Sequence, residues 1–520
     1  MNFSSKERVI FIWSIPANGH MNPMLCFVNE LIPRLDQINV NKIVFYTSES
    51  YKESIENIPN NKIQKRVEFR DYKLEKFTGS ENLLKLLMDF NTKPGALFRV
   101  FKTYRNSVKL GAKYLFKNLT LDMHREKPIL ILYDQALFFG KIVLEFYSKK
   151  FKCSKPLSAC YVTTFMCARG IYPLFSDLEK NGLFGLNLNL KKKLKNYITT
   201  TSDLVKYILT YYKTLWWDLD FTLFDLFLRC DLPLKKWQLA DENLNIVFVL
   251  PEIQPRLEMF QAKQNINFVG PSVDENVRSN KSHDQNKIYK YTEEIELFLY
   301  KNGTKINSYP KIYFNQHSNR LLRSDSDGSN FKKYFKPIIY VSMGTVFQSE
   351  NPNFLKILIK ACQYFSYDYV VIVSTGNENV FDNFHLDLDN NLEDILLIPH
   401  TPQVEILKRA ELFITHAGMN SISEAIIYGV PVICIPLSGD QPMVAWRVAD
   451  ELGMGIRLQP DKNLSVETVR KAISTMLTTP SYRNKAKELS TISKNYYGHR
   501  KACDLTIQFI LKNEAKKALD

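Results

Sequence analysis

The sequence predicts an α/β protein built from two doubly wound parallel-sheet domains. In both halves of the chain, short apolar runs rich in β-branched residues alternate with stretches of helical spacing, as in a parallel sheet covered by helices. The 520 residues, 45% of them hydrophobic, are enough for two sizeable cores. A polar and charged segment over residues 274–336 separates the two halves and is expected to be a mobile insertion between domains.

Composition excludes several classes of protein. The formal net charge is +15, but the lysines are scattered among asparagines, isoleucines and tyrosines, so we expect no nucleic-acid partner. The eight cysteines form no C-x-x-C pair and have no histidine at zinc spacing, which predicts free thiols in a reducing compartment and no metal. Three D-x-D triplets, at 218–220, 325–327 and 387–389, follow no predicted strand, so we do not interpret them as metal-binding motifs.

The N-terminal half opens with a predicted strand over residues 9–15, a helix from Met24 to about Leu35 and a strand over residues 42–46. The first apolar run is too short for a signal peptide and lacks a cleavage site. The turn that follows it contains no G-x-G-x-x-G, so the fingerprint of a nicotinamide or flavin cofactor is missing.

Two polar residues follow strands of this half. His20 comes after the first strand, and Asp134 ends the apolar strand predicted over residues 128–133. Both should emerge at the carboxyl edge of one parallel sheet, where a carboxylate can orient an imidazole that acts as a general base. The simpler alternatives are a capping or packing histidine and an aspartate that caps the helix starting near Ala136.

The most informative stretch runs from Pro399 to Gln441 and predicts one β-α-β unit. Residues 411–415 form a strand, residues 420–428 a helix that Gly429 and Pro431 stop, and residues 432–436 the next strand. The loop from His416 to Ser421 therefore lies where a strand ends and a helix begins, a place that favours a bound phosphate.

The side chains of this stretch suit a nucleotide sugar. His416, Asn420 and Ser421 can donate to phosphate oxygens, and Gly418 allows close approach to the backbone. Glu424, one turn further along, can accept both hydroxyls of a ribose, while Asp440 and Gln441 offer acceptors and donors to a sugar. An ordinary β-α-β unit with a capped helix is the alternative.

These residues resemble the donor-binding signature of the UDP-glycosyltransferases, the inverting, metal-independent enzymes of the GT-B fold, and most closely their macrolide and bacterial-type members. The resemblance implies two facing Rossmann-like domains, with uracil near residues 400–403, ribose at Glu424, diphosphate at residues 416–421 and the sugar at Asp440 and Gln441. Met343-Gly344-Thr345 resembles the family's turn near the phosphates. His400 stands where the family usually has a uracil-stacking tryptophan. The donor-binding residues implied are Thr345, His400, Gln403, His416, Gly418, Met419, Asn420, Ser421, Glu424, Asp440 and Gln441.

The same resemblance extends to the N-terminal half. Residues 16–23 match the family's Pro-x-x-Gly-His-x-x-Pro segment, which implies that His20 is the catalytic base and Asp134 its partner. The aromatic stretches over residues 81–116 and 161–230, including an expected helix over 202–228, favour a hydrophobic, hydroxylated small-molecule acceptor. That helix could touch a membrane surface but carries too many charges to span one.

The expected domains are an acceptor domain over residues 1–273, the insertion over 274–336, a UDP-sugar domain over 337–495 and a helix over 496–520 that crosses back to the first domain. We expect a cytoplasmic, monomeric UDP-dependent hexosyltransferase without a membrane anchor, metal or cofactor, and glucose as the sugar. Two alternatives remain: a UDP-sugar epimerase of the same architecture, which uses no acceptor, and a non-catalytic nucleotide-sugar-binding protein.

Overall fold

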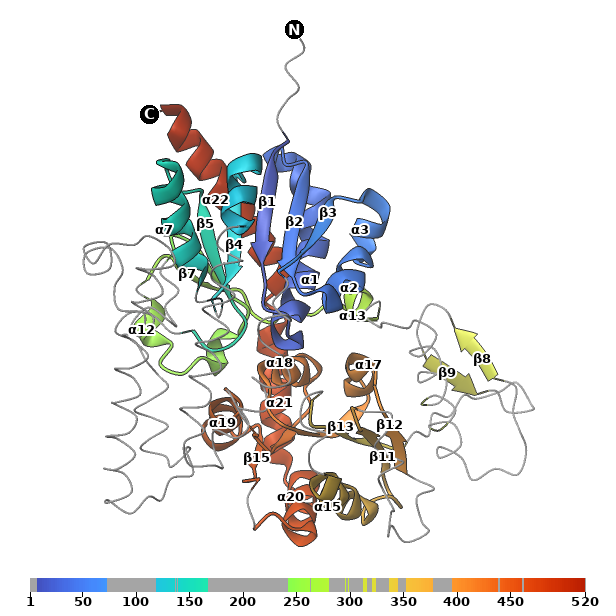
Figure 1. Ribbon diagram of the computed structural model, residues 1–520. Helices are drawn as coiled ribbons and strands as arrows, with labels where there is room; N and C mark the ends of the chain where they lie inside the picture. The colour runs from blue at the N-terminus through green and yellow to red at the C-terminus, as the bar shows by residue number, and fades with distance from the viewer. Residues whose placement is uncertain are drawn as a thin grey trace. The chain divides into compact units, whose positions relative to one another are not determined.

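The structure is a computed structural model, and it describes most of the chain outside the long aromatic segments (Figure 1). The aromatic stretch over 81–116 and the expected helix over 202–228 lie outside the described residues. The described residues are 7–72, 118–166 without 136 and 138, 242–279 without 262, 295, 298, 312–315, 320–323, 336–344, 352–376, 395–437, 440–460 and 463–519.

The chain divides into two compact units. The first comprises Met1–Lys281 together with Ser438–Val444 and Ile492–Asp520, and the second comprises Ser282–Leu437 and Ala445–Thr491. Each unit contains one parallel sheet, so the two doubly wound sheets predicted from the sequence are confirmed.

The sheet of the first unit has seven strands in the order β3-β2-β1-β4-β5-β6-β7, all parallel. The order reverses between β1 and β4, and this switch point opens a crevice at the carboxyl ends of the strands in folds of this kind. The strands are β1 (Val9–Trp13), β2 (Lys42–Thr47), β3 (Val67–Asp71), β4 (Leu130–Asp134), β5 (Ser158–Val162), β6 (Asn245–Val247) and β7 (Ile266–Phe268).

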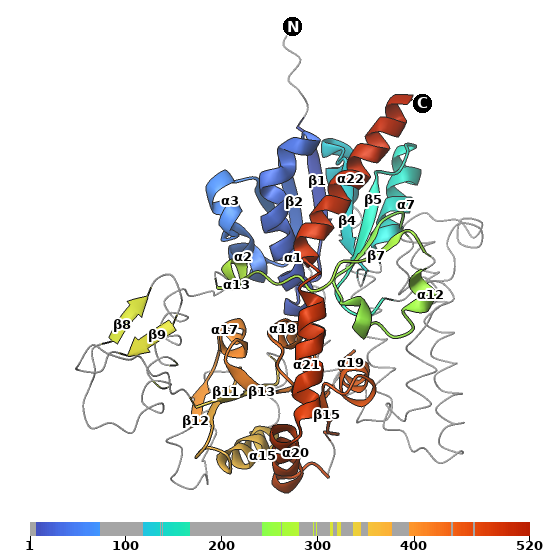
Figure 2. The ribbon, with the colours of Figure 1, turned by 180° about the vertical axis from the view of Figure 1, so that it is seen from behind.

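One face of this sheet is covered by α1, by the 3₁₀ helix η1 and by the last helix of the chain, α22, which lies beside α1 in both ribbon views (Figures 1 and 2). Alternate strand residues such as Ile10 and Ile12 enter a core that also contains Cys503 and Ile507 of α22. The helices of this unit are α1 (Asn18–Leu31), η1 (Ile32–Ile38), α2 (Lys52–Glu56), α3 (Pro59–Gln64), α7 (Phe139–Phe151), α12 (Glu258–Gln261), α13 (Glu275–Ser279) and α22 (Gly498–Leu519).

The first helix begins earlier than predicted. It starts at Asn18, so His20 lies in its first turn, and Pro23 is inside it. A proline there removes only the hydrogen bond to the carbonyl of Gly19, which is near the exposed start of the helix, so the cost is small. The α-helix ends at Leu31, and Pro33 lies at the start of η1.

The sheet of the second unit has six parallel strands in the order β12-β11-β10-β13-β14-β15, with its switch point between β10 and β13. Helices α15 and α20 pack on one face around Val341, Val373 and Ile414. The strands are β10 (Ile338–Ser342), β11 (Val370–Ser374), β12 (Ile395–Ile398), β13 (Ala410–Thr415), β14 (Val432–Cys434) and β15 (Gly455–Arg457). The helices are α15 (Pro352–Gln363), α17 (Gln403–Leu407), α18 (Met419–Tyr428), the π-helix η5 (Trp446–Glu451), α20 (Val466–Thr478) and, running into residues of the first unit, α21 (Pro480–Ser493).

The predicted β-α-β unit around the phosphate loop is present. Helix α18 ends where Gly429 adopts a left-handed conformation with φ of 68°, which costs glycine little. The polar segment over 274–336 contains an antiparallel pair, β8 (Ile312–Asn315) and β9 (Arg320–Arg323), which the sequence analysis did not predict. Each of these strands has only four residues, and their short apolar runs, Ile-Tyr-Phe and Leu-Leu, are too brief within a polar segment to predict a strand.

Candidate active site

His20 and Asp134 meet at the switch point of the first sheet. Asp134 is the last residue of β4, and His20 lies in the first turn of α1, directly after β1. The Nδ1 atom of His20 is 2.7 Å from Oδ2 of Asp134. The carboxylate is 1% exposed and the imidazole 24% exposed. Since an ionised carboxylate can only accept, Nδ1 carries the proton and Nε2 keeps its lone pair, as a general base requires.

The charges around His20 favour its protonated form. Burial opposes the imidazolium, but the charge and hydrogen bond of Asp134, together with the charge of Asp440, outweigh it, so the pKa of His20 is raised above its usual value. A raised pKa makes the neutral imidazole a stronger proton acceptor. It also means that the basic form is lost at a higher pH than for an ordinary histidine.

Two threonines after β5, both missed by the sequence reasoning, form hydrogen bonds with His20 and with Asp440. The Oγ1 atom of Thr163 is 3.1 Å from Nδ1 of His20. The hydroxyl of Thr164 donates to Oδ2 of Asp440, which the structure groups with the first unit. The signal was available, because polar residues that follow a buried parallel strand emerge at the edge that carries the site.

His416 occupies the switch point of the second sheet, directly after β13. Its ring is enclosed by two glycines, since a Cβ atom on Gly418 would lie 2.6 Å from Nε2 and one on Gly344 would lie 2.9 Å from Cε1. Gly344 also has a φ of +79°, which other residues rarely adopt. The two glycines therefore make room for the imidazole.

His416 has no carboxylate beside it among the groups that shift its pKa. Burial lowers that pKa to about 4, although a hydrogen bond with the backbone of Ser342 opposes the shift. Its Nδ1 atom is buried without a hydrogen-bond partner among the described residues. A buried polar atom without a partner indicates a place for a ligand or water. At neutral pH the ring is uncharged and carries one N–H, which it can donate either to the backbone of Ser342 or to an anion, but not to both.

Helix α18 starts beside His416 with Gly418 as its N-cap, and no side chain caps it. The first turn of a helix exposes N–H groups at the positive end of the macrodipole, so this end favours an anion. Ala417, just before the cap, is held at φ of 63°, a left-handed conformation that is strained for alanine. The loop is thus shaped by its surroundings rather than by local preference.

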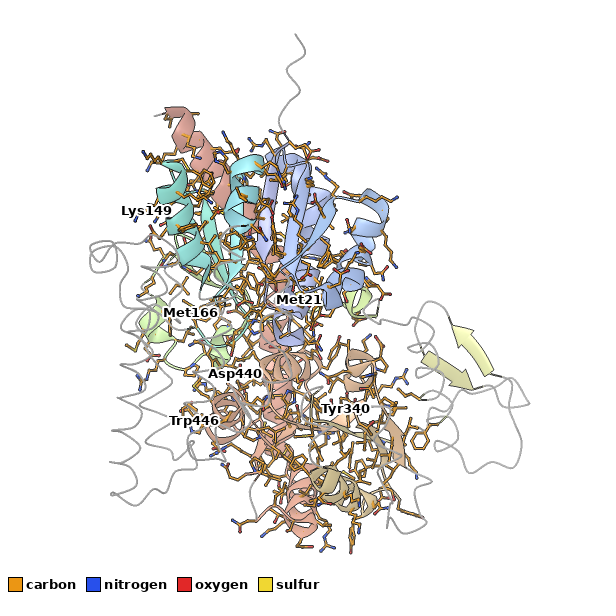
Figure 3. The ribbon with its side chains drawn as sticks, in the orientation of Figure 1. Met21, Lys149, Met166, Tyr340, Asp440 and Trp446 are labelled. Atoms are coloured by element: carbon orange, nitrogen blue, oxygen red, sulfur yellow. The ribbon has the colours of Figure 1, made fainter. Side chains whose placement is uncertain are left out.

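A chain of hydrogen bonds connects the base of this loop to strand β10. Nε2 of Gln403 lies 2.6 Å from Oε2 of Glu424 and 3.3 Å from Oγ of Ser421. The hydroxyl of Tyr340, labelled in Figure 3, lies 3.3 Å from Oε1 of Gln403 and 2.6 Å from Oγ1 of Thr401. Glu424 is 1% exposed, so Gln403 fixes a buried carboxylate. Tyr340 and Thr401 were not anticipated from the sequence.

The other predicted donor residues are spread over this region. Asn420 and Ser421 lie in the first turn of α18 and are partly exposed, whereas the side chain of Met419 is buried and leaves only its backbone for a ligand. His400 is exposed in the turn after β12, and Gln441 begins the short helix α19 (Gln441–Ala445). Thr345 lies outside the described residues.

The described part of the chain lacks two features. No three His, Cys, Asp or Glu side chains there gather as a metal site would need. None of the helices described is long and apolar enough to cross a membrane.

Comparisons with known proteins found a matching family profile and similar sequences. The family profile described as "UDP-glucoronosyl and UDP-glucosyl transferase" matches residues 325–510. The uncharacterized UDP-glucosyltransferase YojK of Bacillus subtilis is 24% identical over 514 residues, which cover 96% of this chain and 97% of that protein.

Solved structures share the fold. The calicheamicin glycosyltransferase CalG4 superimposes with a TM-score of 0.59 at 17% identity, covering 97% of this chain and 98% of that one. Os79 from O. sativa, crystallised with U2F and trichothecene, gives a TM-score of 0.57 at 17% identity, covering 97% and 100%.

Proposed function

We propose that this chain, which has the GT-B fold and matches the UDP-glucoronosyl and UDP-glucosyl transferase family over residues 325–510, is a UDP-glycosyltransferase. It transfers glucose from UDP-glucose to a hydroxyl of a hydrophobic small molecule with inversion. The observation that carries this proposal is the 2.7 Å contact between His20 and Asp134 at a switch point. A non-catalytic binder of nucleotide sugars would have no need of a paired base.

In the proposed reaction, Nε2 of His20 removes the proton of the acceptor hydroxyl while that oxygen attacks the anomeric carbon of the sugar. Asp134 holds the imidazole and stabilises the imidazolium that forms. The bond from the anomeric carbon to the UDP oxygen breaks on the opposite face. Because a single displacement occurs, the anomeric configuration inverts.

The departing diphosphate gains negative charge, and the second unit offers groups suited to it. The N-terminus of α18, the neutral His416 and the hydroxyl of Ser421 are fixed in place before reaction, so they can stabilise the leaving group without reorganising. Glu424, held by Gln403, is the proposed acceptor for the two ribose hydroxyls. Asp440 and Gln441, which belong to the first unit, are proposed to contact the sugar.

The acceptor class is argued from chemistry and from relatives. An imidazole base suits a hydroxyl, and Os79, a structural relative, was crystallised with trichothecene. We therefore propose a hydrophobic, hydroxylated acceptor rather than a sugar or a peptide. The choice of glucose rests on the names of relatives such as YojK.

The test is product analysis by mass spectrometry. Isotope-labelled UDP-glucose, UDP-galactose and UDP-glucuronate are each incubated with the protein and a panel of sterols, flavonoids and macrolides. The proposal expects a glucosylated acceptor with the β-configuration by NMR, and none with the His20→Ala variant.

Three other outcomes would contradict the proposal. An altered UDP-sugar formed without any acceptor would indicate an epimerase instead. A product of α-configuration would contradict single displacement, and transfer from UDP-galactose or UDP-glucuronate alone would overturn glucose as the sugar.

A further inference from the structure

Thr163 lies where it can act on the base. It follows β5 directly, and the register of β4 and β5 sets Asp134 opposite Tyr161, so Thr163 extends past the end of both strands toward α1. Its side chain is buried, with 6% exposed. Among the described residues, its only hydrogen-bond partner through the side chain is His20.

The position of the proton on Nδ1 of His20 determines whether Thr163 donates or accepts a hydrogen bond there. Nδ1 of His20 faces two oxygens, Oδ2 of Asp134 at 2.7 Å and Oγ1 of Thr163 at 3.1 Å. The carboxylate can only accept, so the proton must be on Nδ1, and Thr163 cannot donate its own proton to that atom. The Thr163 oxygen is therefore a second acceptor that shares the same N–H in a three-centre hydrogen bond.

We propose that Thr163 is a positioning residue for the general base: Asp134 sets the tautomer that leaves Nε2 free, and Thr163 together with Asp134 holds the His20 ring in one orientation. The inference rests on the proposed role of His20. A single acceptor at Nδ1 would allow the ring to swing about that contact. Two acceptors from neighbouring strands define the plane of the ring, as a base that must reach a bound hydroxyl requires.

The other groups near His20 do not supply this second contact. Asp134 supplies the first contact through its hydrogen bond and its charge, whereas Asp440 acts on the imidazole through its charge. Tyr161 and Tyr72, which are buried beside Asp134, stay neutral because burial and that carboxylate raise their pKa well above the usual value. An acceptor at Nδ1 favours the imidazolium, so removal of the Thr163 hydroxyl should lower the pKa of His20.

The test compares Thr163→Val and Thr163→Ala, which delete the hydroxyl, with Thr163→Ser, which retains it. Thr506→Val is the matched control, because Thr506 is also buried and its hydroxyl donates only to its own helix, to the carbonyl of Ala502. NMR of 15N-labelled histidine measures the tautomer and pKa of His20, whose signals are identified by their loss in His20→Ala. This readout needs no substrate.

We expect Thr163→Val and Thr163→Ala to titrate at lower pH, with the proton of the neutral ring still on Nδ1 because Asp134 remains, while Thr163→Ser and Thr506→Val resemble the wild type. In assays with UDP-glucose and an acceptor that the enzyme glucosylates, kcat of Thr163→Val and Thr163→Ala should fall about tenfold with little change in KM. In the His20→Ala variant, the additional change Thr163→Val should not lower kcat further.

The outcomes separate this proposal from the function on which it rests. An unchanged titration of His20 in Thr163→Val and Thr163→Ala, or equal impairment of Thr163→Ser, would overturn the positioning role. If the NMR results are as expected but His20→Ala keeps full turnover, the assignment of His20 as the base fails while the contact itself stands.

Discussion

Two histidines occupy comparable places in the two units and have opposite electrostatics. His20 follows β1 and His416 follows β13, and each of these strands borders the switch point of its sheet. His20 faces two carboxylates and its pKa is raised. His416 lies between two glycines, and burial lowers its pKa to about 4.

The difference shows how one fold can supply two kinds of chemistry. A carboxylate beside an imidazole prepares it to take up a proton, whereas glycines and a helix N-terminus prepare an imidazole to remain neutral and donate to an anion. We therefore propose that the first unit carries out the proton transfer and that the second unit binds the diphosphate. The variants below test that division.

The largest effect is expected for His20→Ala. If His20 is the general base, kcat should fall roughly 10² to 10⁴-fold, while the affinity for UDP should not change. Steady-state kinetics with UDP-glucose measure the first quantity. If the variant kept the wild-type kcat, His20 would not be the general base.

Asp134→Asn should make His20 more like His416. Without the carboxylate the imidazolium is no longer stabilised, so the pKa of His20 should fall and kcat should drop by about 10² to 10³-fold. In the profile of kcat/KM against pH, the acid limb should move to lower pH. An acid limb that stays in place would mean that another group titrates there.

Gly418→Ala tests the second unit. The added Cβ would lie 2.6 Å from Nε2 of His416, so the ring must move, and we expect the affinity for UDP to weaken about tenfold. Gly19→Ala is the matched control, because a Cβ there meets nothing within 4 Å. Equal losses in both variants would show that the effect is not specific to the His416 pocket.

The smallest effect concerns stability and pH. The folded-state pKa of His416 is lowered to about 4, so between pH 6.5 and 4 the unfolded chain binds a proton that the folded chain does not. The contribution of His416 is thus present above pH 6.5 and is lost as pH falls. In His416→Gln, the difference in unfolding free energy between pH 7 and pH 5, measured with urea, should be smaller than in the wild type.

Much of this arrangement follows from local patterns in the sequence. Clean apolar runs predicted β1, β4 and β13, and the rule that polar residues at their carboxyl ends share one edge brought His20 and Asp134 together. The strand β3 was missed because its Val-Glu-Phe-Arg-Asp sequence is charged and lies at the edge of the sheet, where burial is partial.

The parts that could not be predicted depend on register and on tertiary packing. Thr163 reaches His20 only because β4 and β5 pair with Asp134 opposite Tyr161. Tyr340 reaches Gln403 across more than sixty residues of sequence. The enclosure of His416 by Gly344 depends on the neighbouring positions of β10 and β13, which no single stretch of sequence reveals.

The central claim is that UDP binding and proton transfer depend on different residues. Titration calorimetry with UDP on the wild type, His20→Ala and Glu424→Ala tests it most directly, because it measures binding without proton transfer. The account predicts equal affinity for the wild type and His20→Ala, and weaker binding by Glu424→Ala. No binding to the wild type, or a loss in His20→Ala as large as in Glu424→Ala, would contradict it.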